Sequence, residues 1–315
     1  MWGGDIVRVI ERYRGSLLGL AVGDALGAAV EFQARGTFEP LTGMVGGGPF
    51  DLEAGQWTDD TSMALCLGCS LLEHEGFDPV DQMNRYLRWY REGYFSSTGE
   101  CFDIGNTIAG ALRIYEKTSH PYCGSTDPLS AGNGSLMRLA PVPMVYREDE
   151  RMVAYYSSES SRTTHSAQEA VQACKLFGVM LSKALQGETK DAILGVRWEM
   201  TGDETELSSA ILSLANREYQ DKTRPEILSS GYVVTSLEAA LWCFSHSDSF
   251  QEAVLLSANL GGDADTTSAI CGQLAGAHYG MQNIPADWLQ VLAMRDKIQM
   301  MADELWELSK RIYIQ

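Results

Sequence analysis

The chain has 315 residues, of which 45% are hydrophobic and 21% are charged, a composition typical of a globular protein with an ample core and not of a disordered one. The formal net charge of −18 argues against a nucleic-acid partner, because binding to a phosphate backbone needs a basic surface. Such acidity is compatible with cationic metals or a basic target such as an arginine side chain, although solubility alone explains it equally well.

Cysteine usage and the N-terminal residues predict a cytoplasmic protein. The seven cysteines are an odd number and lie mostly in apolar runs, which favours free thiols in a reducing compartment. Cys66 and Cys69 form a C-x-x-C pair with no second pair nearby, so we interpret them as buried small residues and not as a zinc or redox motif. Residues 1–14 contain no signal-peptide core, and no apolar run is long enough to span a membrane.

The first predicted element is a helix, or two stacked helices, from Arg8 to Phe32, where apolar residues recur at helical spacing. One face of this segment consists of glycines that recur every four residues, at Gly15, Gly19, Gly23 and Gly27. Glycine weakens a helix, so we expect another backbone or a ligand to approach this face closely.

Two acidic side chains lie on the same segment. Asp24 and Glu31 are seven residues apart and therefore point the same way, either toward a metal site or along an exposed helix face. Residues 36–55 follow as a glycine-rich loop that lacks the lysine and hydroxyl ending of a phosphate-binding P-loop. We interpret this loop as a surface loop, with a mobile flap as the alternative.

The chain then reaches Thr58-Asp59-Asp60-Thr61, which opens the next helix. Helices are predicted at Thr61–Glu75, Pro79–Glu92, Asn106–Lys117, Thr164 to about Leu185, Ser236–Ser245, Phe250–Ser257, Ala269–Met281 and, as one long or two short helices, Asp287–Ile312. Alternating polar and apolar strands are nearly absent. The sequence therefore predicts an all-α fold with a single compact domain over residues 1–315.

Three loops between these helices carry polar side chains suited to a binding site. Asp103 lies among aromatic and small residues just before a helix, where it either caps the helix or points into a pocket. The turn Asn133-Gly134-Ser135 exposes N–H groups that can hold an anion, and Arg138 adds a possible phosphate contact. His165 stands at a helix start, where a single histidine is more often structural than catalytic.

The last polar stretch is Gly261-Gly262-Asp263-Ala264-Asp265-Thr266. Like Thr58-Asp59-Asp60-Thr61, it places two aspartates and a threonine at a helix start. Such clusters of oxygen ligands suit Mg²⁺ or Mn²⁺ better than Zn²⁺. Each cluster alone is also explained as an ordinary helix N-terminus. If the fold brings the two clusters together, they form a binuclear metal site.

Six motifs thus follow one another: Gly19–Gly27, Trp57–Thr61, Phe102–Asn106, Gly132–Arg138, Thr164–Ser166 and Gly261–Thr266. In this order they resemble the ADP-ribosylglycohydrolase family, and within it the bacterial dinitrogenase-reductase-activating glycohydrolases. The resemblance extends from about Arg14 to about Gly280, and the pair of aspartate motifs is its most specific part. It implies an all-α fold with a cleft that binds two Mg²⁺ or Mn²⁺ ions.

The resemblance also implies roles for single residues. The metal ligands would be Thr58, Asp59, Asp60, Asp263, Asp265 and Thr266, with Glu31 beside the metals. Asp103 would bind the guanidinium group of an arginine-linked substrate, since a carboxylate matches a guanidinium through two parallel hydrogen bonds. The ADP-ribose would be bound by Asn133, Gly134, Ser135, His165 and Tyr232, with Tyr232 stacked on adenine or, alternatively, a core tyrosine.

The implied reaction is hydrolysis of the N-glycosidic bond between ADP-ribose and a protein arginine, with ADP-ribose as product. Asp60 or Glu31 would take a proton from the attacking water, and the sugar would pass through an oxocarbenium-like transition state. The alternatives are a hydrolase of serine-linked or small-molecule ADP-ribose conjugates, a two-metal phosphoesterase, or a non-enzymatic family member. The complete set of metal ligands argues against the last. The resemblance is not clear over residues 197–225, so substrate choice there stays open.

Overall fold

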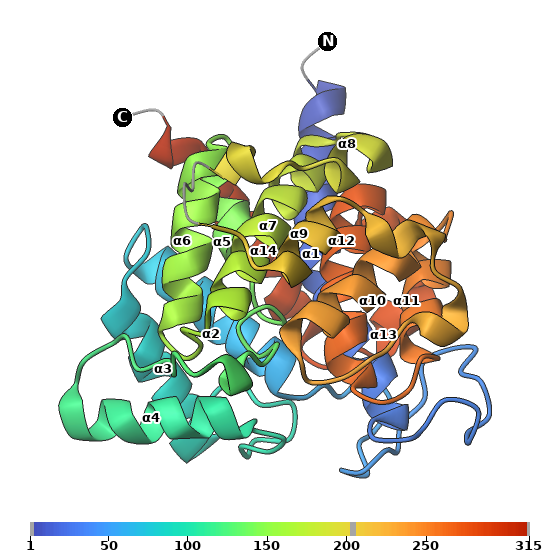
Figure 1. Ribbon diagram of the computed structural model, residues 1–315, viewed down its shortest axis with the longest axis horizontal. Coiled ribbons are helices and arrows are strands. Elements are labelled where there is room, and N and C mark those ends of the chain that lie inside the picture. The colour runs from blue at the N-terminus through green and yellow to red at the C-terminus, as the bar shows by residue number, and fades with distance from the viewer. Residues whose placement is uncertain (1–2, 202–205, 314–315) are drawn as a thin grey trace.

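Two helices from opposite ends of the sequence pack backbone to backbone at the centre of the molecule (Figure 1). The computed structural model describes residues 3–201 and 206–313. Helices α1 (Gly3–Gly27) and α12 (Ala264–Tyr279) touch along the predicted glycine face. A Cβ atom on Gly23 would stand 2.1 Å from the Ser268 carbonyl oxygen, and one on Gly19 would stand 2.4 Å from that of Gly272. The expected close approach of another backbone is thereby confirmed.

Around this pair the described residues form twelve further α-helices. They are α2 (Asp59–Glu73), α3 (Pro79–Glu92), α4 (Asn106–Thr118), α5 (Pro141–Tyr146), α6 (Glu150–Arg162), α7 (Gln168–Gln186), α8 (Lys190–Leu194), α9 (Ser209–Ala215), α10 (Val233–Ser245), α11 (Phe250–Ala258), α13 (Ala286–Val291) and α14 (Arg295–Ile312). Within the described ranges, β-structure is limited to isolated bridges such as Gly132 with Tyr232. The all-α prediction is confirmed.

The predicted helices agree with the structure to within a few residues, with three differences. Helix α12 begins at Ala264, five residues before the predicted Ala269, so the aspartate motif lies on the helix itself. The C-terminal segment forms two helices, α13 and α14. Helices α5, α6, α8 and α9 were not predicted, and α6 buries serines such as Ser157 and Ser161 where an apolar stripe would have marked its inner face.

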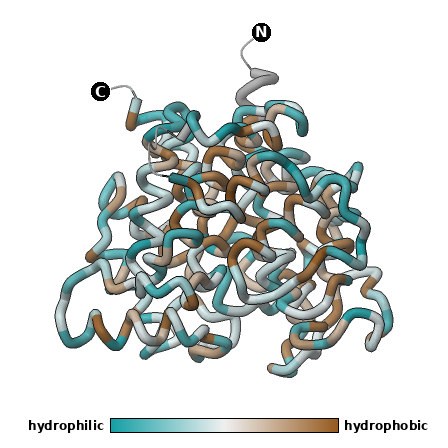
Figure 2. Tube along the Cα trace, viewed as in Figure 1, coloured by the Kyte–Doolittle hydropathy of each residue, from teal (hydrophilic) through white to brown (hydrophobic). Residues whose placement is uncertain are grey.

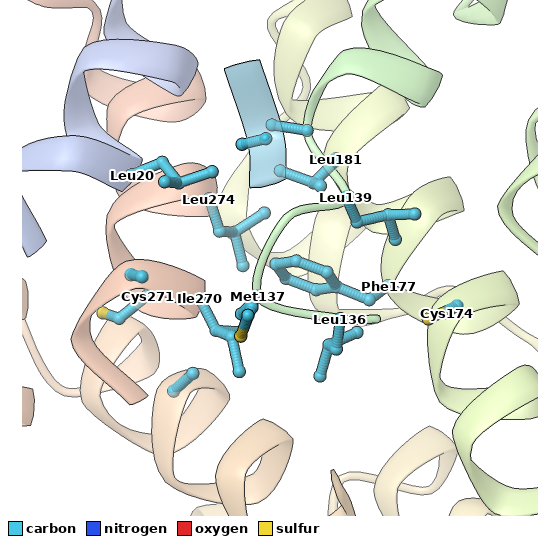
Figure 3. Close-up of a cluster of buried hydrophobic side chains, with 14 of the residues drawn as sticks. Leu20, Leu136, Met137, Leu139, Cys174, Phe177, Leu181, Ile270, Cys271 and Leu274 are labelled. Atoms are coloured by element: carbon cyan, nitrogen blue, oxygen red, sulfur yellow. The ribbon is translucent and has the colours of Figure 1, made fainter. Parts of the chain in front are cut away.

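Buried apolar side chains fill the space between α1, α7, α12 and the segment that precedes α5 (Figure 3). In this cluster Leu20 of α1 and Phe177 of α7 are fully buried, as are Leu139 and Ile270. Hydrophobic residues lie mainly inside and hydrophilic ones outside (Figure 2). The buried side chains form one continuous core, so the described residues form a single compact domain.

The glycine-rich loop is anchored to the domain and does not extend freely into solvent. Gly48 and Gly55 have positive φ angles of 72° and 89°, and their Cα atoms lie against the carbonyl groups of Ala28 and Val291. The Gly55 carbonyl also accepts a hydrogen bond of 2.9 Å from the Ala293 N–H group. This supports the surface-loop interpretation over the mobile flap. None of the helices described is both long and apolar enough to cross a membrane.

Candidate metal centre and active-site cavity

Asp24 of α1 fixes the start of α2. One carboxylate oxygen accepts hydrogen bonds of 2.9 Å from both the N–H and the hydroxyl of Thr58. The other accepts from the N–H and hydroxyl of Thr61, at 3.0 and 2.6 Å. Asp24 therefore caps α2 from a different helix, a task that the N-cap residue Thr58 does not perform with its own side chain. These four hydrogen bonds set the direction in which Asp59 and Asp60 project.

Two glycines fix the path of the chain at the start of α12. Gly261 and Gly262 adopt φ angles of 69° and 67°, and a Cβ atom on either would collide with the carbonyl oxygen of Gln33 or Ser229. The Gly262 N–H donates to the Gln33 carbonyl at 2.8 Å, and the Phe32 N–H donates back to Gly262 at 2.7 Å. This pairing holds the segment of Glu31 against the segment of Asp263 and Asp265.

The two aspartate motifs meet. The Thr58 hydroxyl lies 3.2 Å from Asp60 Oδ2 and 3.4 Å from Asp265 Oδ2, and the Thr266 hydroxyl lies 3.4 Å from Asp60 Oδ2. Carboxylate oxygens of Asp24, Asp60 and Asp265 lie within 4.8 Å of one another. The same holds for Glu31, Asp103 and Asp265. Asp265 belongs to both groups and stands between them.

The pKa values of the carboxylates in this cluster are raised. Burial first, and then the charges of neighbouring carboxylates, raise the pKa values of Asp59, Asp60 and Asp265 well above the ordinary range. The same causes raise the pKa of Glu31 to about 9 and that of Asp103 to about 7. Among the described residues, no lysine, arginine or histidine forms an ion pair with these carboxylates.

The donor set fits a divalent cation. Three carboxylate oxygens are buried without a hydrogen-bond donor in the described part of the chain: Glu31 Oε2, Asp60 Oδ1 and Asp265 Oδ1. A buried anionic oxygen is costly unless a proton or a cation compensates it. All the converging atoms are carboxylate or hydroxyl oxygens, which are the ligands that Mg²⁺, Mn²⁺ and Ca²⁺ prefer.

The acidic cluster lies in the wall of a cavity of about 360 Å³. Asp103 faces it and does not cap α4, whose N-cap is Gly105. The Asp103 backbone has a φ of 57°, a left-handed conformation that aspartate tolerates better than most residues. Of its two sequence interpretations, the structure supports the carboxylate that points into a pocket.

Some of the predicted substrate residues line the cavity and others do not. Asn133, Gly134 and His165 line it, as does Gly132, which was not predicted to bind substrate. The Asn133 amide donates hydrogen bonds of 2.5 Å to Asp263 Oδ2 and 2.7 Å to Ser236 Oγ, so in this structure it supports a predicted metal ligand. Burial and then the charge of Arg138 lower the pKa of His165 to about 3, so this histidine is neutral.

Ser135 and Tyr232 lie outside the cavity lining. The Ser135 hydroxyl is buried against Ser161 and Cys174, so only its main chain is available to a ligand. Tyr232 is 38% exposed, and its hydroxyl donates to Glu169 at 2.5 Å, so Tyr232 is not a core tyrosine.

The interpretation of Arg138 as a possible phosphate contact is wrong. It is fully buried, stacks on the Tyr86 ring and donates to the Gly134 carbonyl at 3.1 Å and the Thr164 hydroxyl at 2.8 Å. It therefore holds the turn before α5 in place and cannot reach a phosphate. Sequence reasoning also missed the first residues of α4, Asn106 to Ile108, which line the cavity. The glycine just before that helix was the available signal.

The fold and the site together define the class of protein. It is an all-helical domain in which carboxylates from the starts of α2 and α12 meet at one cavity as a candidate metal centre. The chain belongs to the ADP-ribosylglycohydrolase family, whose sequence model matches residues 6–313. It is 43% identical to a protein of Pseudomonas putida (strain GB-1) named ADP-ribosylarginine hydrolase Tri1, over 97% of this chain and 80% of that protein. A protein of the same name from Serratia proteamaculans (strain 568) is 40% identical, over 94% of this chain and 79% of that protein.

Two further likenesses agree with this assignment. An ADP-ribosyl-dinitrogen reductase glycohydrolase of Rhodospirillum rubrum is 32% identical, over 91% of this chain and 92% of that protein. A solved structure titled "ADP-ribosylglycohydrolase-related protein complex" superposes with a TM-score of 0.85 at 41% identity, over 96% of this chain and 99% of that one. The predicted family is thereby confirmed.

Proposed function

We propose that this chain is a metal-dependent hydrolase that cleaves the N-glycosidic bond between ADP-ribose and a protein arginine, and so reverses mono-ADP-ribosylation. The observation that carries the proposal is the meeting of Glu31, Asp103 and Asp265, whose carboxylate oxygens lie within 4.8 Å of one another at one cavity. A carboxylate suited to a guanidinium thus stands beside a cluster suited to cations. The names of the relatives from Pseudomonas and Serratia support the same linkage.

The metal ligands in this proposal are those expected from the sequence: Thr58, Asp59, Asp60, Asp263, Asp265 and Thr266. We infer two cations, because Asp265 takes part in two separate groups of carboxylates. Mg²⁺ or Mn²⁺ would hold the ribose hydroxyl groups and lower the pKa of a bound water. Asp24 belongs to one of the two groups but is occupied by four hydrogen bonds, so its role here is to position α2.

Asp103 is proposed to accept two parallel hydrogen bonds from the substrate guanidinium. A positive guanidinium beside it would lower its pKa from about 7, so that the carboxylate is charged in the complex. Asp60 or Glu31 is proposed as the general base. Within residues 3–201 and 206–313, each has one buried oxygen without a hydrogen-bond partner, and nearby cations would favour its deprotonated form over the protonated form that burial favours.

The rest of the ADP-ribose is proposed to lie along the turn at Asn133. In the part of the chain that the structure describes, the N–H groups of Gly134 and Ser135 have no acceptor and are available to a diphosphate. Neutral His165 lies beside this turn, and its Nδ1 is 2.9 Å from the Thr164 hydroxyl. Tyr232, bridged to Gly132, is proposed to stack on adenine.

A product assay tests the proposal. Peptides that carry ADP-ribose on arginine or on serine are incubated with the chain after EDTA treatment, with and without added Mn²⁺ or Mg²⁺. We expect the arginine peptide to release intact ADP-ribose when Mn²⁺ or Mg²⁺ is present and not when the cation is absent. Release of phosphate or AMP would favour a phosphoesterase instead. Equal release from the serine peptide would favour the broader ADP-ribosyl hydrolase, and restoration by Zn²⁺ alone would contradict the oxygen-ligand argument.

The partner in this proposal is an arginine-ADP-ribosylated protein, and the net charge of −18 gives no basis for a nucleic-acid partner. The cytoplasm is proposed as the place of action. All seven cysteines are free thiols and five of them are buried, as expected of a protein kept in a reducing compartment.

A further inference from the structure

A second, larger hollow adjoins the active-site cavity. We call it the arginine groove; it has a volume of about 1000 Å³ and lies between residues 34–40, residues 224–229 and the end of α11. The two hollows share their dividing wall. Phe32 and Asp263 line the cavity, while Ala34 and Gly262 line the groove. The hydrogen bonds between Gly262 and the segment of residues 32–33 form that wall.

The groove combines positive charge with apolar surface. Its cations are Arg35 and Arg224, and no carboxylate in the described residues forms an ion pair with either. Glu252 is the one carboxylate among the described lining residues, and it accepts a hydrogen bond from the Asp248 N–H group. Burial first, and then the charge of Arg224, lower the pKa of Arg35. With two arginines and one carboxylate among its described lining residues, the groove is a locally positive site on a chain whose net charge is −18.

Main-chain carbonyl groups hold Arg35 more firmly than Arg224. The guanidinium of Arg35 donates to the carbonyl groups of Leu260, Arg224 and Ile227, one from each nitrogen. Arg224 donates from Nη2 to the Asn259 carbonyl at 3.0 Å. Each guanidinium has five N–H groups, and these bonds use three on Arg35 and one on Arg224, so the remaining groups can pair with a carboxylate. The apolar lining favours a peptide segment over a small phosphate as the bearer of that carboxylate.

Apolar side chains line the rest of the groove, and Leu228 among them is 59% exposed. Phe32 on the shared wall is 67% exposed. Large apolar side chains that gather around a hollow beside an active site mark a place where another molecule binds. The wall between the two hollows is narrow, so a protein whose modified arginine enters the cavity can place neighbouring residues in the groove.

We propose that the arginine groove binds a segment of the ADP-ribosylated target protein that carries carboxylate and apolar side chains next to the modified arginine. This rests on the proposed function for its substrate. It adds that the enzyme selects targets by the sequence around the arginine, through a surface separate from the ADP-ribose site.

Two peptides test the proposal, both with a central arginine, one flanked by glutamate and leucine and the other by lysine and serine. Binding of the unmodified, fluorescein-labelled peptides is measured by anisotropy. We expect the wild-type chain to bind the acidic, apolar peptide on the order of tenfold more tightly. Arg224→Glu and Leu228→Asp should each remove this preference. Arg151→Glu on α6 and Leu212→Asp on α9 make the same changes at exposed positions outside the groove, and should keep it.

The same peptides carrying ADP-ribose on the arginine give a second readout. The ratio of kcat/KM for the acidic peptide to kcat/KM for free ADP-ribosylarginine should fall in the groove variants and not in the controls. Equal binding of the two peptides by the wild-type chain, or groove variants that behave like the controls, overturns the proposal. So does a dimer, seen by sedimentation, that Leu228→Asp dissociates, since a second copy would then be the occupant. Failure to release ADP-ribose from any conjugate counts against the proposed function only, because the binding measurement uses unmodified peptides.

Discussion

Among the described residues, Asp60 and Asp265 each keep one buried carboxylate oxygen without a hydrogen-bond donor, where α2 and α12 meet. Asp60→Asn or Asp265→Asn should reduce turnover by more than about a hundredfold, since even the residues that support a metal ligand account for up to that much. The fold should survive, because burial already disfavours the charge that the amide removes. Hydrolysis, calorimetric Mn²⁺ titration and the thermal midpoint in EDTA check this. Near-normal activity with unchanged Mn²⁺ affinity in either variant would contradict the site.

Substitution of Asp103 should have a different effect, because its proposed partner is the substrate guanidinium and not a metal. Asp103→Ala should lower kcat/KM for arginine-linked ADP-ribose by about tenfold to several hundredfold, the effect of a lost charge-assisted pair. Hydrolysis of a serine-linked conjugate, which presents no guanidinium, serves as the internal control. An equal loss on both linkages would mean that Asp103 acts on the cations or the water instead.

At the scale of elements, the separation of α1 and α12 is set by glycines. Gly23→Ala would place a Cβ atom 2.1 Å from the Ser268 carbonyl, so the helices must move apart, at a cost of about 3 kcal/mol, the upper end for overpacking. Because α1 carries Asp24 and α12 carries Asp265, Mn²⁺ affinity should fall as well. Chemical denaturation and metal titration measure both effects.

Gly110 is the matched control for that variant. It lies inside α4, and no atom of the part of the chain that the structure describes stands within 4 Å of an added Cβ atom. Gly110→Ala should therefore stabilise the chain by about 0.5–1 kcal/mol through helix propensity alone. If the two alanines had the same effect on stability, the close contact between α1 and α12 would not exist in solution.

The same glycines show how far the sequence predicts the structure. Their spacing predicted a close backbone neighbour but not which one, because Gly272 and Gly276 sit inside an apolar run that needs no such partner. The two aspartate motifs and Asp103 were predictable as local chemistry at helix starts. Helix α6 was not, since its buried serines satisfy neighbouring groups in place of an apolar stripe. Nor was Arg138, whose charge suggested a ligand while the fold uses it to hold main-chain carbonyls.

At the scale of the whole molecule, the buried carboxylates couple stability to pH. In the folded, metal-free chain burial holds the pKa of Glu31 near 9 and raises those of Asp59, Asp60 and Asp265, whereas the unfolded chain has ordinary values near 4. The folded state therefore binds more protons, and its stability falls as pH rises toward 9, by about 1.4 kcal/mol per pH unit for each proton involved.

Two histidines, the buried His165 and the half-buried His278, act in the opposite direction, but over a lower pH range. Burial lowers the pKa of His165 to about 3 and that of His278 to about 4, so the unfolded state binds more protons than the folded state up to about pH 6.5. Their contribution to stability is lost as pH falls from 6.5 and is constant above pH 7. Between pH 7 and 8.5 the carboxylates therefore determine the slope together with the buried cysteines, whose raised pKa values lower stability in the same direction as pH approaches 8.5.

A divalent cation should reverse that slope, because it replaces the protons that the carboxylates would otherwise hold. The rise in thermal midpoint caused by a fixed excess of Mg²⁺ over EDTA should therefore grow between pH 7 and 8.5, while the midpoint in EDTA alone falls. Asp265→Asn removes the carboxylate common to both groups and should flatten both trends. A metal-induced shift that is independent of pH in the wild-type chain would mean that the cation does not bind at these carboxylates.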